Sequence, residues 1–310
     1  MMVAGYDIWG ASLSHASRKS VLSLQLLRAS RSFSPPPCKL PVSLSPDMPQ
    51  LIYTQCILPE SETGISISLV RDQGSGVEYV VKSSLRSLQE EYDLQTRLAG
   101  PHITHTHGYF YDGRHHILME YCQRLDLFTY LEDKDLTESE AKRLFKQLVA
   151  AIETCHNASI VHLDIKPENC FIDAQGKLKL GDFGFAKEMQ PRELVHIFCG
   201  TLEYMSPEVH LKKPFEGTKA DIFAAGKVLF EMALGFTPFT VATLKDRNFR
   251  LFTKQPAEYW ERKRLCLAER SEQVAWNPQL LDLLQRMLSL QPACRPTIQE
   301  VKLHPWLSVD

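Results

Sequence analysis

The sequence predicts an α+β fold with two lobes: a small β-sheet with one helix over residues 51–119, a hinge at 120–122, and a larger, mainly helical lobe over residues 123–308. One observation behind this prediction is the stretch VHLDIKPENCFIDAQGKLKLGDFGFAK at 161–187, which combines polar side chains with a short hairpin pattern. A second is the order of motifs, with a lysine-bearing strand before this stretch and an apolar helical run after it. The length of 310 residues suffices for one such domain plus a tail.

The stretch at 161–187 carries the residue types that magnesium-dependent phosphoryl transfer requires. Asp164 is followed five positions later by Asn169, and Asp182 opens an Asp-Phe-Gly triplet. The alternation of lysine and leucine over residues 177–180 predicts a strand after a tight turn, which would bring Asn169 and Asp182 together. This spacing would place a base beside an acceptor hydroxyl and two metal ligands beneath the nucleotide phosphates.

On these residues the chain resembles the eukaryotic protein kinase family, Ser/Thr type, and in particular its calcium/calmodulin-dependent and AGC-like groups. The resemblance covers roughly residues 51–308 and implies the two-lobed protein kinase fold, with ATP and Mg²⁺ as cofactors. The segment at 204–208, Tyr-Met-Ser-Pro-Glu, is similar to the end of the family's activation segment. Structural roles are implied for Asp221, which would bond the catalytic loop, and for Arg295, which would pair with Glu208.

The resemblance also assigns the roles in phosphoryl transfer. Asp164 would be the base that accepts the proton of the substrate hydroxyl, and Lys166 would neutralise charge on the transferring phosphoryl group. Asn169 and Asp182 would hold magnesium. The lysine at position 166 favours serine or threonine over tyrosine as the acceptor.

Residues upstream of this stretch would bind the nucleotide. Lys82, at the end of the strand that begins at Glu78, is similar to the lysine that holds the α- and β-phosphates and pairs with a helix glutamate. Counting back from Pro101 favours Glu91 as its partner, whereas a one-residue insertion would favour Glu90. The remaining nucleotide contacts are expected from the backbone of Glu120 and Cys122, which would bind the base, and from Asp126, which could reach the ribose.

The loop expected over the phosphates departs from the family pattern. Residues 60–70 contain a single glycine, Gly64, although glycines make the approach of backbone amides to a phosphate sterically easy. Gly74 and Gly76 are predicted to form the next hairpin turn instead. Two interpretations therefore stay open: an active Ser/Thr kinase, or a pseudokinase that acts as a binding or scaffold module.

Two further expectations concern the protein substrate and the activation segment. No Ser, Thr or Tyr lies between Asp182 and Gly200, and Leu163 replaces the arginine that commonly pairs with a phosphorylated residue in such a segment. We therefore expect apolar packing to hold the segment, with Thr201 in a structural role that bonds Asp164 and Lys166. A substrate that is basic around the acceptor is predicted from four carboxylates expected at the peptide groove, Asp126, Glu168, Glu203 and Glu231.

Composition limits the other classes of function. The 35 lysines and arginines are balanced by 37 acidic residues, so we expect no nucleic-acid partner, and no apolar run approaches the ~20 residues of a membrane span. The eight cysteines form no CxxC pair, which predicts reduced thiols in the cytoplasm or the nucleus. Residues 1–50, rich in serine and proline, predict a disordered tail. Within it, residues 31–36 (RSFSPP) resemble a phosphoserine motif that could bind an adaptor protein.

Overall fold

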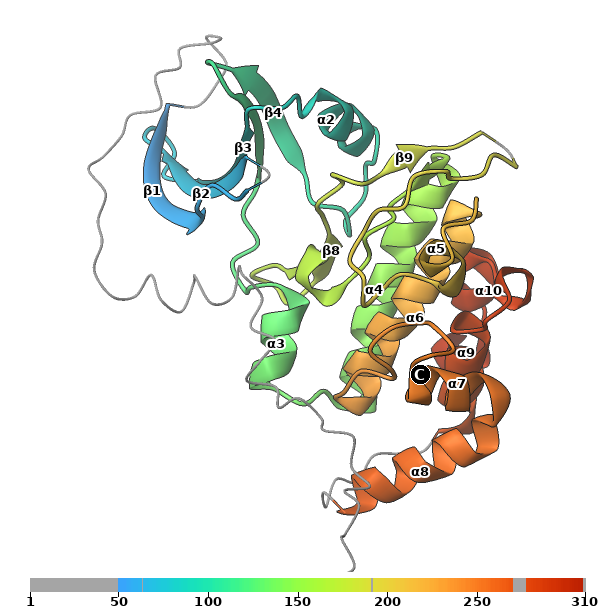
Figure 1. Ribbon diagram of the computed structural model, residues 1–310. Helices are drawn as coiled ribbons and strands as arrows, with labels where there is room; N and C mark the ends of the chain where they lie inside the picture. Colours follow the sequence, from blue (N-terminus) through green and yellow to red (C-terminus); the bar gives the residue numbers. More distant parts are fainter. Residues whose placement is uncertain (1–49, 63, 191, 270–276, 309–310) are drawn as a thin grey trace, which may run out of the picture.

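The computed structural model describes residues 50–62, 64–190, 192–269 and 277–308 (Figure 1). The predicted disordered tail and its adaptor motif lie outside the described residues, apart from Gln50. Within these ranges, no helix combines the length and the apolar character that a membrane crossing would require.

A five-stranded antiparallel sheet forms the smaller lobe, with helix α2 (Gln89–Thr96) beside it. The strand order is β1-β2-β3-β5-β4, which places β3 at the centre of the sheet. The strands are β1 (Leu51–Leu58), β2 (Ile65–Asp72), β3 (Glu78–Ser84), β4 (Thr106–Tyr111) and β5 (His115–Glu120).

Strand β3 continues past Lys82, which corrects the expectation that this lysine ends the strand. Lys82 is opposite Ile67 of β2 on one side and Ile117 of β5 on the other, so the paired ladder carries β3 on to Ser84. The turn between β2 and β3 contains Gly74 and Gly76, as predicted. A central, doubly paired strand is a rigid support for a charged side chain.

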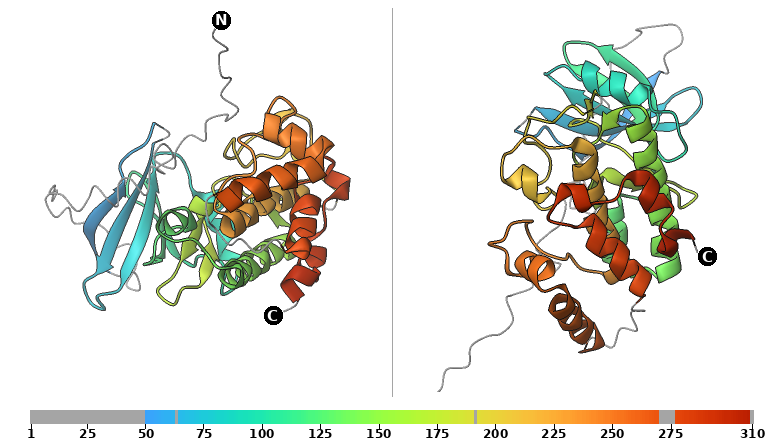
Figure 2. Two further views of the ribbon diagram at one scale, coloured as in Figure 1. Left: turned by 90° about the horizontal axis from the view of Figure 1, so that it is seen from below. Right: turned by 90° about the vertical axis from the view of Figure 1, so that its right-hand side faces the viewer.

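The larger lobe is mainly helical and lies at the other end of the molecule from the sheet (Figure 2). Its longest helices, α4 and α6, pack against each other, and α6 is buried along most of its length. A capping box between Thr137 and Glu140 begins α4. The helices are α3 (Leu127–Asp133), α4 (Glu138–Asn157), α5 (Pro207–His210), α6 (Gly217–Leu234), α7 (Arg247–Lys254), α8 (Pro256–Glu269), α9 (Pro278–Met287), α10 (Ile298–Lys302) and α11 (Pro305–Ser308), with 3₁₀ turns at Pro167–Asn169 and Pro292–Cys294.

Two short two-stranded sheets lie at the top of the helical lobe, between the five-stranded sheet and helices α4 and α6 (Figure 1). One pairs β6 (Ile160–Val161) with β9 (Lys187–Glu188), and the other pairs β7 (Cys170–Ile172) with β8 (Leu178–Leu180). The predicted hairpin within the stretch at 161–187 is therefore confirmed. The turns that flank these strands carry most of the predicted catalytic residues.

Candidate active site

The loop between β6 and β7 carries Asp164 and is fixed from below by helix α6. The carboxylate of Asp221 accepts hydrogen bonds from the backbone N–H groups of His162 (2.9 Å) and Leu163 (2.8 Å), as predicted for this residue. Leu163 has a φ of 64°, a left-handed conformation that a leucine adopts only when its surroundings enforce it. The loop is thus held in one conformation, with Asp164 only 4% exposed.

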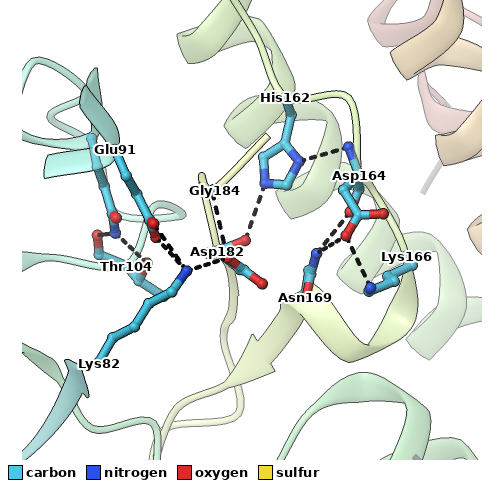
Figure 3. A network of polar contacts seen from close by, with 11 residues as sticks. Lys82, Glu91, Thr104, His162, Asp164, Lys166, Asn169, Asp182 and Gly184 are labelled. Atoms are coloured by element: carbon cyan, nitrogen blue, oxygen red, sulfur yellow. Dashed lines mark hydrogen bonds and ion pairs between the residues drawn. The ribbon is translucent and has the colours of Figure 1, made fainter. Parts of the chain in front are cut away.

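Asp164 contacts Lys166 and Asn169 (Figure 3), and it also contacts Thr201. Its Oδ2 lies 2.9 Å from Nζ of Lys166, and its Oδ1 accepts from the backbone N–H of Thr201 at 2.7 Å. Lys166 in turn donates to Oγ1 of Thr201 at 2.6 Å. This arrangement joins a carboxylate that can accept a proton to an ammonium that can stabilise negative charge.

Asn169 and Asp182 come together through the hairpin of β7 and β8. The backbone N–H of Gly181 donates to the carbonyl of Asn169 at 2.9 Å, which fixes the two segments side by side. The Nδ2 of Asn169 donates to the carbonyl of Asp164 at 2.8 Å and to its Oδ2 at 3.1 Å. The amide nitrogen is committed to the catalytic loop, so the amide oxygen is the atom that remains to bind a cation.

The donor set fits Mg²⁺ that shares its coordination with a nucleotide. An amide oxygen of Asn169 and a carboxylate of Asp182, whose side chain is 45% exposed, are the hard oxygen ligands that this ion prefers. No cluster of three or more His, Cys, Asp or Glu side chains arranged to hold a metal occurs in the described part of the chain. An ion held by these two residues would therefore complete its octahedral shell with phosphate oxygens and water.

Lys82 joins the two lobes by ion pairs with Glu91 and Asp182. Its Nζ lies 2.8 Å from Oε1 of Glu91 and 2.9 Å from Oδ1 of Asp182 (Figure 3). Burial alone would lower the pKa of Lys82, but the charges of Asp182 and Glu91 raise it overall. The charge of Lys82 lowers the pKa of Asp182 to about 2, so that this carboxylate is ionised throughout the neutral range.

The structure selects between the two candidate partners of Lys82. Glu91 is buried and faces β3, together with the buried Leu94 three residues later on α2. Glu90 points to the surface, where its carboxylate lies 2.7 Å from Nζ of Lys187. Glu91 is therefore the partner of Lys82.

The three residues predicted near the base and the ribose lie where the two lobes join. Glu120 ends β5, and its carboxylate accepts from Nζ of Lys179 at 2.7 Å, an inter-lobe contact that the sequence did not indicate. Cys122 is buried, and burial raises the pKa of its thiol to about 12. Asp126 is 3% exposed and caps α3, since its Oδ1 accepts from the N–H of Thr129 at 2.8 Å. The nucleotide contacts of these three residues stay predictions.

The turn between β1 and β2 is hydrogen-bonded to the turn between β4 and β5. Gly64, with a φ of 79°, donates its N–H to the carbonyl of Ser61 at 2.8 Å. Arg114, between β4 and β5, donates to the carbonyl of Gly64 at 3.0 Å and to the carboxylate of Glu60 at 3.2 Å. The glycine here satisfies the left-handed backbone of the turn.

Apolar packing holds the activation segment at Val195, in part as the sequence predicted, whereas Ile197 and Phe198, which stand where a phosphosite would lie, are 55% and 40% exposed. Leu163 packs against a buried cluster of Val161, Val195, Val209, Phe215 and Ala220. Within the segment, the backbone of Val195 also pairs with that of Phe215 at 2.8 and 3.1 Å. Leu163 thus makes an apolar contact at a position where an arginine would pair with a phosphate.

The end of the same segment is held by an ion pair. Arg295 contacts both carboxylate oxygens of Glu208, at 2.6 and 2.7 Å, with its side chain fully buried. This confirms the structural pair predicted from the sequence. A bidentate pair of this kind fixes both position and orientation.

Three of the four carboxylates predicted at a peptide groove gather beside the catalytic loop. Burial raises the pKa of Glu168 to about 7; the charge of Lys166 opposes this rise, and the charges of Glu231 and Asp126 add smaller contributions to it. Glu231 accepts a hydrogen bond from the hydroxyl of Tyr204 at 2.8 Å. Oε2 of Glu168 is buried and has no hydrogen-bond partner among the described residues.

Sequence reasoning did not single out Lys227, which lies in the middle of α6. Its side chain is fully buried beneath Tyr204 and contacts the segment that follows Thr201. The available signal was a charged residue inside the apolar run AAGKVLF, in a helix expected to be buried.

Comparisons with known proteins agree with this geometry. The protein kinase domain family matches residues 76–307. Sperm motility kinase 2B of Mus musculus is 34% identical over 194 residues, which cover 62% of this chain and 37% of that protein. Probable serine/threonine-protein kinase MARK-C of Dictyostelium discoideum is 31% identical over 200 residues, which cover 64% of this chain and 24% of that protein.

A plant relative is matched over a longer region. CBL-interacting serine/threonine-protein kinase 13 of Arabidopsis thaliana is 32% identical over 235 residues, which cover 74% of this chain and 44% of that protein. The matched regions thus span from about a quarter to less than half of the length of these curated relatives.

Proposed function

The chain belongs to the protein kinase domain family, and we propose that it is a Ser/Thr protein kinase, which transfers the γ-phosphate of ATP to a serine or threonine of a protein substrate. The observation that carries this proposal is the position of Asp164, 2.9 Å from Lys166 and bonded to the amide of Asn169. The proposed base Asp164, the ammonium of Lys166 and the candidate metal ligand Asn169 are therefore in direct contact. The names of the Dictyostelium and Arabidopsis relatives favour serine or threonine as the acceptor.

Each residue has a defined task in this proposal. Asp164 accepts the proton of the acceptor hydroxyl, and Lys166 stabilises the charge that develops on the transferring phosphoryl group. Lys82, oriented by Glu91, contacts the α- and β-phosphates. Mg²⁺, held by Asn169 and Asp182, would neutralise charge on the phosphate oxygens.

A basic protein substrate fits the carboxylates beside the catalytic loop. Glu168 has a buried oxygen without a hydrogen-bond partner in the described structure, and the charges of Glu231 and Asp126 lie close to it. An arginine side chain near the acceptor would supply both positive charge and hydrogen-bond donors to this group. No side-chain contact joins Glu203 to this cluster among the described residues, so its part in substrate binding rests on the sequence alone.

One observation favours a second candidate, a pseudokinase that binds partners with little or no nucleotide turnover. The β1–β2 turn offers only Gly64, whose backbone freedom is used to close the turn. Phosphate binding would then depend on Lys82 and the metal ligands. The intact set of Lys82, Asp164, Asn169 and Asp182 makes the active kinase the better supported of the two.

Phosphorylation of a peptide library tests the proposed function. The purified full chain, with ATP and Mg²⁺, should transfer phosphate to Ser and Thr peptides with arginine upstream of the acceptor. It should label matched peptides with acidic residues at those positions more slowly. No transfer to any peptide, or transfer that persists in Asp164→Asn at the wild-type rate, would contradict the proposal.

A further inference from the structure

Lys227 is a fully buried lysine in the central helix of the larger lobe. The residues on either side of it in α6, Gly226 and Val228, are apolar and buried. A buried ammonium is unfavourable unless its charge is balanced and its protons are bonded. The contacts of Lys227 therefore indicate why a charge lies at this position.

The ammonium of Lys227 connects two segments that are distant from each other in the chain. Its Nζ donates to the carbonyl of Phe239, after α6, at 3.0 Å and to the carbonyl of Glu203 in the activation segment. It also lies 4.8 Å from the ring centre of Phe239 and 5.3 Å from that of Tyr204, within the range of a cation–π interaction.

The segment that Lys227 contacts follows directly on the catalytic residues. Thr201 is bonded to Asp164 and Lys166, and Tyr204 is bonded to Glu231. Between them, Leu202 points outward and is 56% exposed. The backbone of Leu202 and its neighbours is thus held at Thr201 from the catalytic loop and at the Glu203 carbonyl from α6.

We propose that Lys227 is a positioning residue for the protein substrate: through the carbonyl of Glu203 and the ring of Tyr204, it sets the conformation of residues 202–204, which present an apolar contact to the residue beside the acceptor. This inference rests on the proposed kinase activity for its effect on catalysis. Its structural part, the fixing of residues 202–204, can be measured without any activity.

The test compares two substitutions in the same turn of α6. Lys227→Met removes the ammonium and keeps most of the side-chain stem, whereas Val228→Ala removes buried apolar volume at the neighbouring position and leaves the ammonium of Lys227 in place. Amide hydrogen exchange is measured over residues 200–208 of the full chain. The KM values for peptide and for ATP are measured in parallel. A general loss of stability would change both values, whereas a local effect on residues 202–204 would change only the KM for peptide.

Lys227→Met should speed exchange of the amides in this segment roughly ten- to a hundredfold, as expected for the loss of a charge-assisted hydrogen bond. It should raise the peptide KM by a similar factor and leave the ATP KM within about twofold of wild type. Val228→Ala should leave the exchange of this segment and the peptide KM unchanged, even where it lowers the melting temperature.

Unchanged exchange over residues 200–208 in a folded Lys227→Met protein would overturn the proposal. So would an equal rise in the ATP and peptide KM values. If Lys227→Met does not fold, Lys227→Gln, which keeps a neutral hydrogen-bond donor but loses the charge, is measured instead, and it should show the same changes with a smaller magnitude. Failure of both variants to fold would show that the lysine serves the stability of the core, and would also overturn the proposal. An inactive wild-type protein would refute the proposed function, whereas the exchange comparison would still decide the role of Lys227.

Discussion

The nucleotide-facing region of the proposed site (Lys82, Glu91, Asn169 and Asp182) differs from its peptide-facing region (Glu168, Tyr204 and Glu231) in how carboxylate charge is balanced. Asp182 contacts Lys82 at 2.9 Å, which lowers the pKa of Asp182 to about 2. Burial raises the pKa of Glu168 to about 7, and Oε2 of Glu168 has no hydrogen-bond partner in the described structure. A lysine of the chain thus pairs with Asp182, whereas a buried oxygen of Glu168 is left to which an arginine of the proposed substrate could donate.

Substitution of the proposed base should have the largest effect. Asp164→Asn removes the proton acceptor but keeps an oxygen that can accept from the N–H of Thr201, so we expect the fold to persist. Turnover should fall by roughly 10²- to 10⁴-fold, the usual contribution of a general base. Steady-state kinetics on a Ser peptide and a melting curve check both parts, and a variant with nearly wild-type kcat would refute the role of Asp164.

The two glutamates at the start of α2 offer a matched pair for the next largest effect. Glu91→Gln should lower kcat/KM by at least roughly tenfold, because breaking a buried ion pair leaves the charge of Lys82 poorly oriented. Glu90→Gln should stay within about twofold of wild type, since the Glu90 side chain is 71% exposed and such surface pairs contribute little. Equal kinetics for the two variants would show that the Lys82–Glu91 contact does not matter for catalysis.

The peptide-facing region should respond to pH between 6 and 8. Glu168 has its pKa raised to about 7, so it is mostly protonated at pH 6 and mostly ionised at pH 8. The ratio of kcat/KM for an arginine-containing peptide to that for a matched neutral peptide should therefore rise roughly five- to tenfold over this range.

Glu168→Gln is the control for this pH dependence, because its side chain cannot ionise. The variant should show a low and flat preference across the same range. A wild-type ratio that stays constant from pH 6 to 8, or a Glu168→Gln protein that keeps the rise, would remove Glu168 from substrate recognition.

The sequence predicted the parts of this molecule that depend on local pattern. The alternation over 177–180 predicted the β7–β8 hairpin, and the spacing of Asp164, Asn169 and Asp182 predicted the grouping around it. The replacement at Leu163 predicted its apolar contact with the activation segment, which the structure forms through Val195 and not through the exposed Ile197 and Phe198.

Sequence patterns alone do not show which segments, distant from each other in the chain, come into contact in the fold. Counting along the chain favoured Glu91 over the adjacent Glu90 as the partner of Lys82, and the packing of α2 on the sheet was needed to exclude Glu90. The Glu120–Lys179 pair joins residues from two lobes. Lys227 contacts a carbonyl, a group that every residue carries and that no sequence pattern reveals.

We expect the nucleotide-facing region to bind Mg²⁺-ATP despite the single glycine of the β1–β2 turn, and thermal unfolding with and without millimolar Mg²⁺-ATP tests this binding. A ligand at ~100 times its Kd adds about 2.7 kcal/mol to the free energy of unfolding, a rise of roughly 5 °C or more in melting temperature for a domain of this size. We expect that rise for the wild-type chain, and a much smaller one for Asp182→Asn, which weakens the metal site. A melting temperature that does not change with Mg²⁺-ATP would contradict the account and favour the pseudokinase.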